Sequence, residues 1–190
     1  MSQDVLCKRC GCVLDGVLHL TGCQPSSNLE GLARRESMST PAVGAPIPRP
    51  TWGQTFMDVA DVFSRRATCP RLSVGALLVQ EGGIPGPGGY NGARRGAPHC
   101  NDVGCDLQML NGRESCQRAV HAEANAIFNA GRVGFKTGGS TLYVTAAPCL
   151  RCVDAIIQAG IVRVVYRDAY GLDGVGLLKA AGVQVEQLSR

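Results

Sequence analysis

The sequence predicts an α/β protein in which helices cover both faces of a sheet. Beyond residue 50, apolar segments of strand length alternate with segments whose apolar residues recur at three- and four-residue steps, and this alternation is typical of a sheet layered with helices. The chain has 190 residues, of which 45% are hydrophobic. A chain of this length and composition can bury the core of one domain, so we expect a three-layer α/β/α sandwich.

The chain changes character near residue 50. Residues 1–50 contain four cysteines, five prolines and little periodicity, and they end in PAVGAPIPRP, a composition typical of a linker. We therefore expect a flexible, cysteine-containing N-terminal extension with a proline-rich linker over residues 1–50, followed by a folded domain over residues 51–190.

The first elements of this domain are a helix and two strands. Apolar residues recur with helical spacing over residues 52–63, which predicts an amphipathic helix. Residues 73–80 (SVGALLVQ) predict a buried strand, and a glycine turn leads to a second strand that ends near residue 91. Pro85 and Pro87 lack the N–H group that a central strand needs, so we expect this second strand at an edge of the sheet.

The later elements alternate along the chain. Helices are predicted in HAEANAIFNAG (121–131), in CLRCVDAIIQAG (149–160) and near GVGLLKAAG (174–182), and strands in STLYVTA (140–146), IVRVVYR (161–167) and VQVEQL (183–188). Two of these predicted helices begin at a histidine or a cysteine, at residues 121 and 149. Their amino ends can therefore position reactive side chains.

Two short motifs indicate a metal site. His121 is followed two residues later by Glu123, and Pro148 precedes the pair Cys149 and Cys152. Together they match the H-x-E…P-C-x-x-C signature of zinc nucleobase deaminases. One imidazole and two thiolates make a three-ligand zinc site, which leaves the fourth tetrahedral position for a water and so distinguishes a catalytic zinc from a structural one.

The spacing of each motif suits this chemistry. At the start of a helix, His121 and Glu123 can approach one water from different angles, the first as zinc ligand and the second as the group that takes and returns its proton. Cys149 and Cys152 lie three residues apart on one helix face. Unpaired N–H groups in a first helical turn stabilise thiolates.

Simpler interpretations exist for each motif alone. A Cys-x-x-Cys pair can be a redox pair or half of a structural zinc site, and a single histidine is more often a core or surface residue. The combination of His121, Glu123, Pro148 and the cysteine pair favours the catalytic interpretation. Ten cysteines without an apolar signal peptide also favour metal binding in the cytoplasm over a secreted disulfide scaffold, and no apolar run is long enough to span a membrane.

Four blocks carry a resemblance to a known family. They are TWGQTFMDVADVFSRRATCPRLSVGALLV, GYNGARRGAPHC, C-x-R-A-V-HAEANAI and TLYVTAAPCLRC, and in this order and spacing the chain resembles the cytidine/deoxycytidylate deaminase superfamily, above all its deoxycytidylate (dCMP) deaminases. The resemblance implies a cytidine deaminase-like fold with a mixed central sheet of about five strands. It also implies zinc-dependent hydrolysis of dCMP to dUMP and ammonia, in a hexamer-like homo-oligomer.

The resemblance also suggests which residues contact the nucleotide. Asn91 would bind the sugar hydroxyls, Arg94 or Arg95 the 5′-phosphate, and the Ala122 N–H the pyrimidine carbonyl, while Thr145 would shape the pocket. Arginine suits a phosphate because its planar fork donates paired, charge-assisted hydrogen bonds. The alternatives are a solvated loop face for the two arginines and a simple Asn-Gly turn at residues 91–92.

Family members commonly bind dCTP and dTTP as opposing effectors. The resemblance places such a site near Tyr90 and Gly92, and Arg132 after the HAE helix is a further candidate. An arginine at a helix end is, alternatively, only a partner of the helix dipole.

Further cysteines could hold a second, structural zinc. The candidates near the substrate loop are Cys69, His99, Cys100, Cys105 and Cys116, and the alternative is that these thiols pack as small hydrophobic groups. In the N-terminal extension, Cys7, Cys10, His19 and Cys23 could form a zinc knuckle. There the alternatives are a disordered segment or a true start at Met38.

The residues are also compatible with other functions. The zinc chemistry would equally serve another cytosine nucleotide or a base in tRNA or another nucleic acid. A net charge of +4 and 5% aromatic residues weigh against a nucleic-acid substrate. A non-catalytic zinc protein used for assembly is a third class, but such a protein has no need of Glu123.

Overall fold

The structure is a computed structural model that describes residues 48–110, 112–171 and 174–188. The N-terminal candidates Cys7, Cys10, His19 and Cys23, together with Met38, lie outside the described residues. Within the described ranges, no helix is both long and apolar enough to cross a membrane.

A mixed five-stranded sheet forms the centre of the domain. Its order is β2 (Ile84–Tyr90), β1 (Gly75–Gln80), β7 (Thr141–Ala146), β8 (Arg163–Asp168) and β9 (Gln184–Gln187). β1 pairs antiparallel with both β2 and β7, whereas β7, β8 and β9 are parallel. The predicted mixed sheet is confirmed.

The second strand lies at the sheet edge, as its prolines predict. β2 pairs with β1 alone in the five-stranded sheet. The register between the two strands shifts by one residue between Leu77 and Val79, so that Leu77 faces Gly88 but Val79 faces Pro85. The two prolines of β2 lie in this irregular stretch, because a proline cannot continue the ladder of hydrogen bonds.

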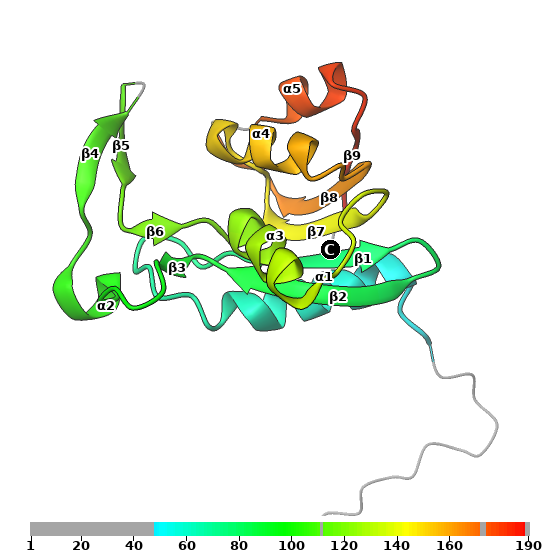
Figure 1. Ribbon diagram of the computed structural model, residues 1–190, viewed down its shortest axis with the longest axis horizontal. Helices are drawn as coiled ribbons and strands as arrows, with labels where there is room; N and C mark the ends of the chain where they lie inside the picture. Colours follow the sequence, from blue (N-terminus) through cyan, green and yellow to red (C-terminus); the bar gives the residue numbers. More distant parts are fainter. Residues whose placement is uncertain (1–47, 111, 172–173, 189–190) are drawn as a thin grey trace, which may run out of the picture. The chain divides into compact units, whose positions relative to one another are not determined.

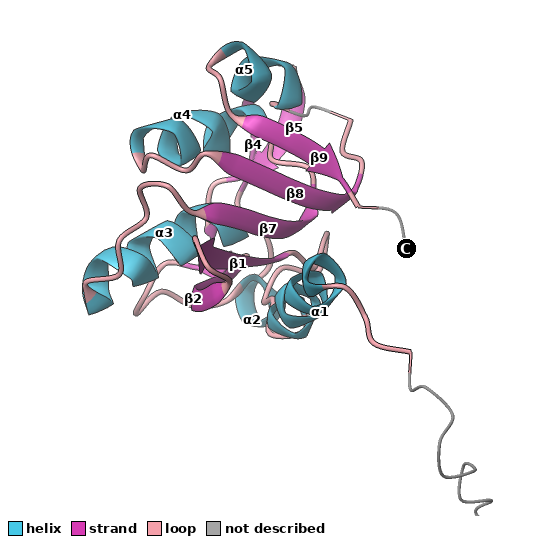
Figure 2. Cartoon of the chain, turned by 90° about the vertical axis from the view of Figure 1, so that its right-hand side faces the viewer, coloured by secondary structure: helices cyan, strands magenta, loops and turns pink. Residues whose placement is uncertain are grey.

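Helices cover both faces of the sheet (Figure 2). α1 (Trp52–Ser64) packs on one face, where Phe56, Met57 and Ala60 meet Leu77, Val79 and Tyr143. The other face carries α3 (Ala122–Val133), α4 (Leu150–Gln158) and α5 (Val175–Ala180). Their shared core includes Leu78, Ala126, Leu142, Val144, Ile156, Val164 and Leu178. The predicted three-layer sandwich is confirmed.

Two glycines let the helices approach the sheet closely. A Cβ atom at Gly75 would collide with the α1 backbone at Ala60, and one at Gly89 would collide with the α3 backbone at Ala122. At the same contact, Asn125 of α3 donates from Nδ2 to the Tyr90 carbonyl over 2.8 Å. The start of α3 is thus held against the end of β2.

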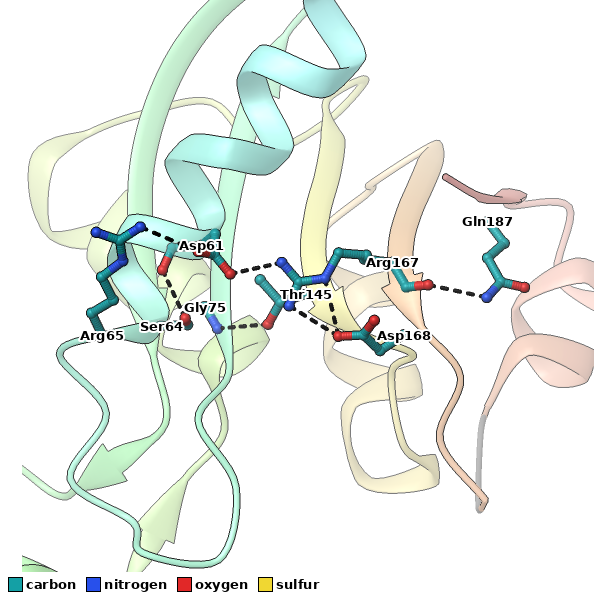
Figure 3. Close-up of polar contacts among 8 residues, drawn as sticks. All are labelled: Asp61, Ser64, Arg65, Gly75, Thr145, Arg167, Asp168 and Gln187. Carbon is teal, nitrogen blue, oxygen red and sulfur yellow. Dashed lines mark hydrogen bonds and ion pairs between the residues drawn. The ribbon is translucent and has the colours of Figure 1, made fainter. Parts of the chain in front are cut away.

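On the sheet face that α1 covers, polar contacts connect this helix to β8 (Figure 3). Arg167 of β8 donates to both Asp61 of α1, at 2.7 Å, and Asp168, at 2.9 Å. The Asp61 pKa lies below its usual value because of its hydrogen bond with Arg167. Nearby, the Gly75 N–H donates to the Thr145 hydroxyl over 3.1 Å.

Several short elements lie outside the main sheet, and the sequence pattern does not predict them. β3 (Gly92–Ala93) pairs with β6 (Ala119–Val120), and α2 (Cys100–Val103) follows β3. β4 (Leu107–Leu110) and β5 (Arg113–Cys116) form a hairpin that stands apart from the five-stranded sheet (Figure 1). Elements of two to four residues are too short to show a period in the sequence.

Candidate active site

The two motifs meet at the amino ends of two neighbouring helices. His121 is the residue that precedes α3, and Glu123 lies in the first turn of that helix. Cys149 precedes α4 and Cys152 lies in its first turn. The first amide groups of a helix have no partner within it and carry partial positive charge. Both helix ends therefore favour thiolate and carboxylate groups at this point.

The three predicted ligands form one cluster. The His121 Nδ1 atom lies 3.3 Å from Cys149 Sγ and 3.4 Å from Cys152 Sγ, and the two sulfurs are 4.0 Å apart. Around a tetrahedral zinc, two thiolate sulfurs lie roughly 3.8 Å apart and a sulfur and a nitrogen roughly 3.5 Å apart. The spacing and the donor types of this cluster therefore fit zinc.

The electrostatics of the cluster agree with a cation site. The Cys149 pKa is lowered to about 4, first by its hydrogen bond with Cys152 and then by His121, which favours the thiolate form. The hydrogen bond between His121 and Cys149 raises the pKa of His121. A separate hydrogen bond, between Cys149 and Cys152, is the main cause of the raised pKa of Cys152. The three groups thus share protons, which a metal ion would release on binding.

Glu123 is a buried carboxyl group beside this cluster. Its residue is 4% exposed, and burial raises its pKa above the ordinary value. A carboxyl group whose pKa is raised holds a proton more readily than an ordinary carboxyl group. This is the behaviour expected of the proton-transfer group that the sequence assigned to Glu123.

A cavity of about 420 Å³ opens onto the cluster. Among the residues predicted for the catalytic zinc and the substrate, Asn91, Ala122, Glu123, His121 and Cys149 line it. Asn91 is held rigidly, because its Oδ1 accepts from the Val74 N–H at 2.7 Å and its Nδ2 donates to the Leu72 carbonyl at 2.6 Å. One amide hydrogen and one oxygen lone pair of Asn91 stay available for a ligand.

Three other predicted contacts are not among the described residues that line the cavity. Thr145 is 2% exposed and accepts a hydrogen bond from the Gly75 N–H. Arg94 is exposed and donates to the Gln117 carbonyl at 2.9 Å, and Arg95 is exposed as well.

Two arginines that the sequence analysis did not select do line the cavity. They are Arg71, in the loop between α1 and β1, and Arg151, in the first turn of α4. Arg151 stands between the two cysteine ligands, a position that could have drawn attention to it. Arg71 gave no local signal, because its approach to the cavity depends on tertiary packing. Leu72, Leu110, Glu114, Ser115, Leu150 and Tyr170 complete the outer wall.

The residues suggested for an effector site are spread over the domain. Tyr90 and Gly92 flank Asn91 at the end of β2. Arg132 lies in the last turn of α3, 11 residues after His121, which corresponds to roughly 16 Å along a helix axis. Its Nη1 atom lies 3.5 Å from Asn129 Oδ1.

A second thiol cluster lies beside the cavity. The sulfur atoms of Cys100, Cys105 and Cys116 all lie within 4.8 Å of one another, and those of Cys100 and Cys116 are 3.7 Å apart. Cys69, also buried, lines the cavity together with Cys116. His99 is exposed and is not part of this group.

Comparisons with known proteins agree with the site. Residues 50–168 match the family model of the cytidine and deoxycytidylate deaminase zinc-binding region. The chain is 43% identical over 144 residues to ComE operon protein 2 of Bacillus subtilis, covering 75% of this chain and 74% of that protein. It is 40% identical to the deoxycytidylate deaminase of Schizosaccharomyces pombe, covering 73% of this chain but 44% of that protein.

A solved structure supports the same assignment. The dCMP deaminase of the cyanophage S-TIM5, in complex with dCMP and dUMP, superimposes with a TM-score of 0.62 at 31% identity, covering 75% of this chain and 100% of that one. The family model of a zinc-binding region spans both ligand motifs, and the cluster of His121, Cys149 and Cys152 could hold the ion. The chain belongs to the cytidine and deoxycytidylate deaminase family.

Proposed function

We propose that this protein hydrolyses dCMP to dUMP and ammonia. The observation that carries the proposal is the cluster of His121, Cys149 and Cys152, next to a cavity that His121, Cys149 and the buried Glu123 line. The proposal is supported by relatives named deoxycytidylate deaminase and by the similar phage enzyme in complex with dCMP and dUMP.

The chain's own residues supply proton transfer and orientation. Bound zinc polarises a water and so makes a nucleophile near neutral pH. Glu123 takes one proton from the attacking water and gives it to the pyrimidine ring nitrogen, where it remains in the product, and it then passes the second hydrogen of the same oxygen to the leaving amine, which departs as ammonia. The Ala122 N–H is proposed to donate to the pyrimidine carbonyl. The proposal is supported by its position in the first turn of α3, because first-turn amides have no partner within the helix.

Asn91 is proposed as the sugar-binding residue. Its two bonds to the backbone hold the amide group in one orientation, so little side-chain entropy is lost when a sugar hydroxyl binds. A ligand can then use its free hydrogen and lone pair. Thr145 is proposed to act indirectly, by fixing β7 to β1 behind the site.

Arg71 and Arg151 are the stronger candidates for the 5′-phosphate. Both line the cavity, and guanidinium groups bind phosphate through paired, charge-assisted hydrogen bonds. The assignment to Arg94 and Arg95 stays a prediction. Double alanine variants of each pair separate the two, because loss of the true phosphate ligands lowers kcat/KM for dCMP by about tenfold or more per contact and spares deoxycytidine.

A second, structural zinc is proposed at the thiol cluster of Cys100, Cys105 and Cys116, with Cys69 as the fourth candidate ligand. The support is the mutual proximity of the three sulfurs and the burial of Cys69. Closed sites with four cysteines are typical of structural zinc. Zinc analysis of the purified protein tests this, with about two ions per chain expected and one ion contradicting it.

The wider setting follows from the same proposal. We expect regulation by dCTP and dTTP near Tyr90, Gly92 and Arg132, a hexamer-like homo-oligomer, and a cytoplasmic location, where thiol ligands stay reduced. We also propose the division into an extension over residues 1–50 and a zinc-dependent deaminase domain over residues 51–190. A nucleic-acid substrate or another cytosine nucleotide is the alternative.

A substrate panel tests the proposed function. The purified protein is incubated with dCMP, dCTP, deoxycytidine, cytosine and a cytosine-containing oligonucleotide, and loss of the cytosine absorbance is followed. We expect dCMP to give the highest kcat/KM. A preference for any of the other compounds would replace the proposed substrate while keeping the reaction type.

A further inference from the structure

The strand β5 connects the thiol cluster to the catalytic cavity. Its last residue, Cys116, belongs to the cluster with Cys100 and Cys105. The two residues before it, Glu114 and Ser115, line the cavity. One short strand therefore contacts both sites.

Both arginines of the cavity are anchored on this strand. Arg151 Nη1 donates to Ser115 Oγ over 3.0 Å, and Nη1 and Nη2 of Arg71 each lie 3.4 Å from the Glu114 carbonyl oxygen. Both arginines are exposed residues, and a free arginine side chain has roughly 2 kcal/mol of rotamer entropy. Adjacent residues of β5 thus restrict two guanidinium groups that come from separate parts of the chain.

The hairpin needs support at its base to act in this way. In the described part of the chain, β4 and β5 pair with each other only, and the β4 residues are all exposed. A two-stranded hairpin alone is marginally stable in water. Contacts at its base are the 3.7 Å approach of the Cys100 and Cys116 sulfurs and the Gln117 N–H bond to the Asp106 carbonyl at 2.8 Å.

We propose that β5 is a positioning strand for the phosphate-binding arginines, and that the thiol cluster at its base thereby sets the preference for a nucleotide over a nucleoside. Ser115 is the main positioning residue, because it holds Arg151 through a side-chain bond. This inference rests on the proposed function, and in particular on Arg71 and Arg151 as the phosphate ligands. It adds a specificity role to a cluster that would otherwise only stabilise the fold.

The chemistry predicts a selective effect. A 5′-phosphate receives charge-assisted bonds from the two guanidinium groups, whereas a nucleoside has no group that uses them. If the two arginines are held less firmly, binding of the nucleotide is weakened, whereas the base and sugar contacts that a nucleoside makes stay in place. The quantity that reports on β5 is the ratio of kcat/KM for dCMP to kcat/KM for deoxycytidine.

Ser115→Ala is the direct test, with Gln108→Ala as its matched control. Gln108 faces Ser115 across the hairpin and is exposed, so its loss perturbs the hairpin equally but holds no arginine. We expect Ser115→Ala to lower the ratio of kcat/KM for dCMP to kcat/KM for deoxycytidine about fivefold or more. Calorimetry should show a similar rise in the ratio of the Kd of dUMP to the Kd of deoxyuridine. Gln108→Ala should keep both ratios.

Cys105→Ser tests the contribution of the cluster. Cys105 belongs to the cluster and does not line the cavity, so the same loss of preference is expected without any change in a cavity residue. A preference unchanged within twofold in Ser115→Ala overturns the proposal, whatever Cys105→Ser does. A folded Cys105→Ser protein with unchanged preference overturns the role of the cluster.

The outcome can be separated from failure of the proposed function. If the parent protein does not deaminate dCMP, the proposed function fails, and the calorimetric comparison of dUMP with deoxyuridine still reports on β5. If the parent protein deaminates dCMP and deoxycytidine equally well, the phosphate assignment and this inference fail together while the zinc chemistry stands.

Discussion

Glu123 is the residue on which turnover depends most directly. It is buried beside the ligand cluster, and its carboxyl group is the one proton carrier that the proposed reaction uses. Glu123→Gln keeps the size of the side chain and all three zinc ligands. We expect kcat to fall by about 10² to 10⁴, the range associated with positioned acid and base groups, with zinc content unchanged.

Glu81→Gln, in the exposed turn after β1, is the control for this prediction and should behave like the parent protein. Near-parent turnover in Glu123→Gln would contradict the assignment of the proton-transfer role.

The metal ligands should affect both activity and stability. Cys149→Ala leaves an incomplete site of one imidazole and one thiol. We expect loss of about one zinc per chain, loss of activity and a lower melting temperature, because a metal that binds only the folded state stabilises it by mass action. Zinc analysis and thermal unfolding, with and without a chelator, measure this. Parent-like zinc content would rule out the site.

At the scale of elements, the contact between α3 and β2 places the site. Gly89 lies against the α3 backbone at Ala122 and Ala126, so a methyl group there forces the helix away from the strand. We expect Gly89→Ala to destabilise the domain by about 1 to 3 kcal/mol, the usual cost of overpacking. It should also reduce activity, because Ala122 and Glu123 begin the displaced helix.

Gly131→Ala is the matched control on the same helix. Nothing lies within 4 Å of a Cβ atom at this position, and alanine is preferred over glycine inside a helix by roughly 1 kcal/mol. This variant should therefore be slightly more stable than the parent. Chemical unfolding of both variants tests the packing, and equal stabilities would show that α3 tolerates a shift.

The ion pair between α1 and β8 predicts a pH dependence. The Asp61 pKa is lowered from 3.8 by its bond with Arg167, so the folded state favours the charged form. The pair therefore stabilises the protein above about pH 3.8, and this contribution is lost as the pH falls through the lowered pKa of the folded state.

Asp61→Asn should lower the free energy of unfolding by about 1 kcal/mol at neutral pH. This difference in stability from the parent should shrink as the pH falls below 3.8 and through the lowered pKa of Asp61. Arg65→Ala removes only the exposed 3.6 Å partner of Asp61 and should have little effect at any pH. A difference between Asp61→Asn and the parent that stays constant down to pH 3 would show that the pair is not electrostatically important.

At the scale of the whole molecule, local patterns predicted the layers and the metal site. Prolines in β2 predicted an edge strand. Each ligand motif lies within a single helix start, so spacing alone places Cys149 and Cys152 on one side of α4 and places His121 directly before the first turn that contains Glu123. The meeting of the two motifs was predicted from their combination in one zinc-binding signature, because no local pattern brings residues 121 and 149 together.

The outer wall of the cavity could not be predicted in the same way. Arg151 contacts Ser115 across 36 residues of sequence and Arg71 contacts Glu114 across 43. The hairpin that carries both partners has four-residue strands, too short for a clear period. The family resemblance instead suggested the adjacent arginines Arg94 and Arg95 for the phosphate, and these two are not among the described residues that line the cavity.

We propose that His121, Cys149 and Cys152 hold a zinc ion at which Glu123 assists the hydrolysis of dCMP. The most direct measurement is product analysis after reaction of the zinc-loaded protein with dCMP in ¹⁸O-labelled water. The account predicts one ammonia for each dUMP and one ¹⁸O atom at the new carbonyl of dUMP, with neither product from Glu123→Gln on the same timescale. Absence of dUMP, or dUMP without the label, would contradict it.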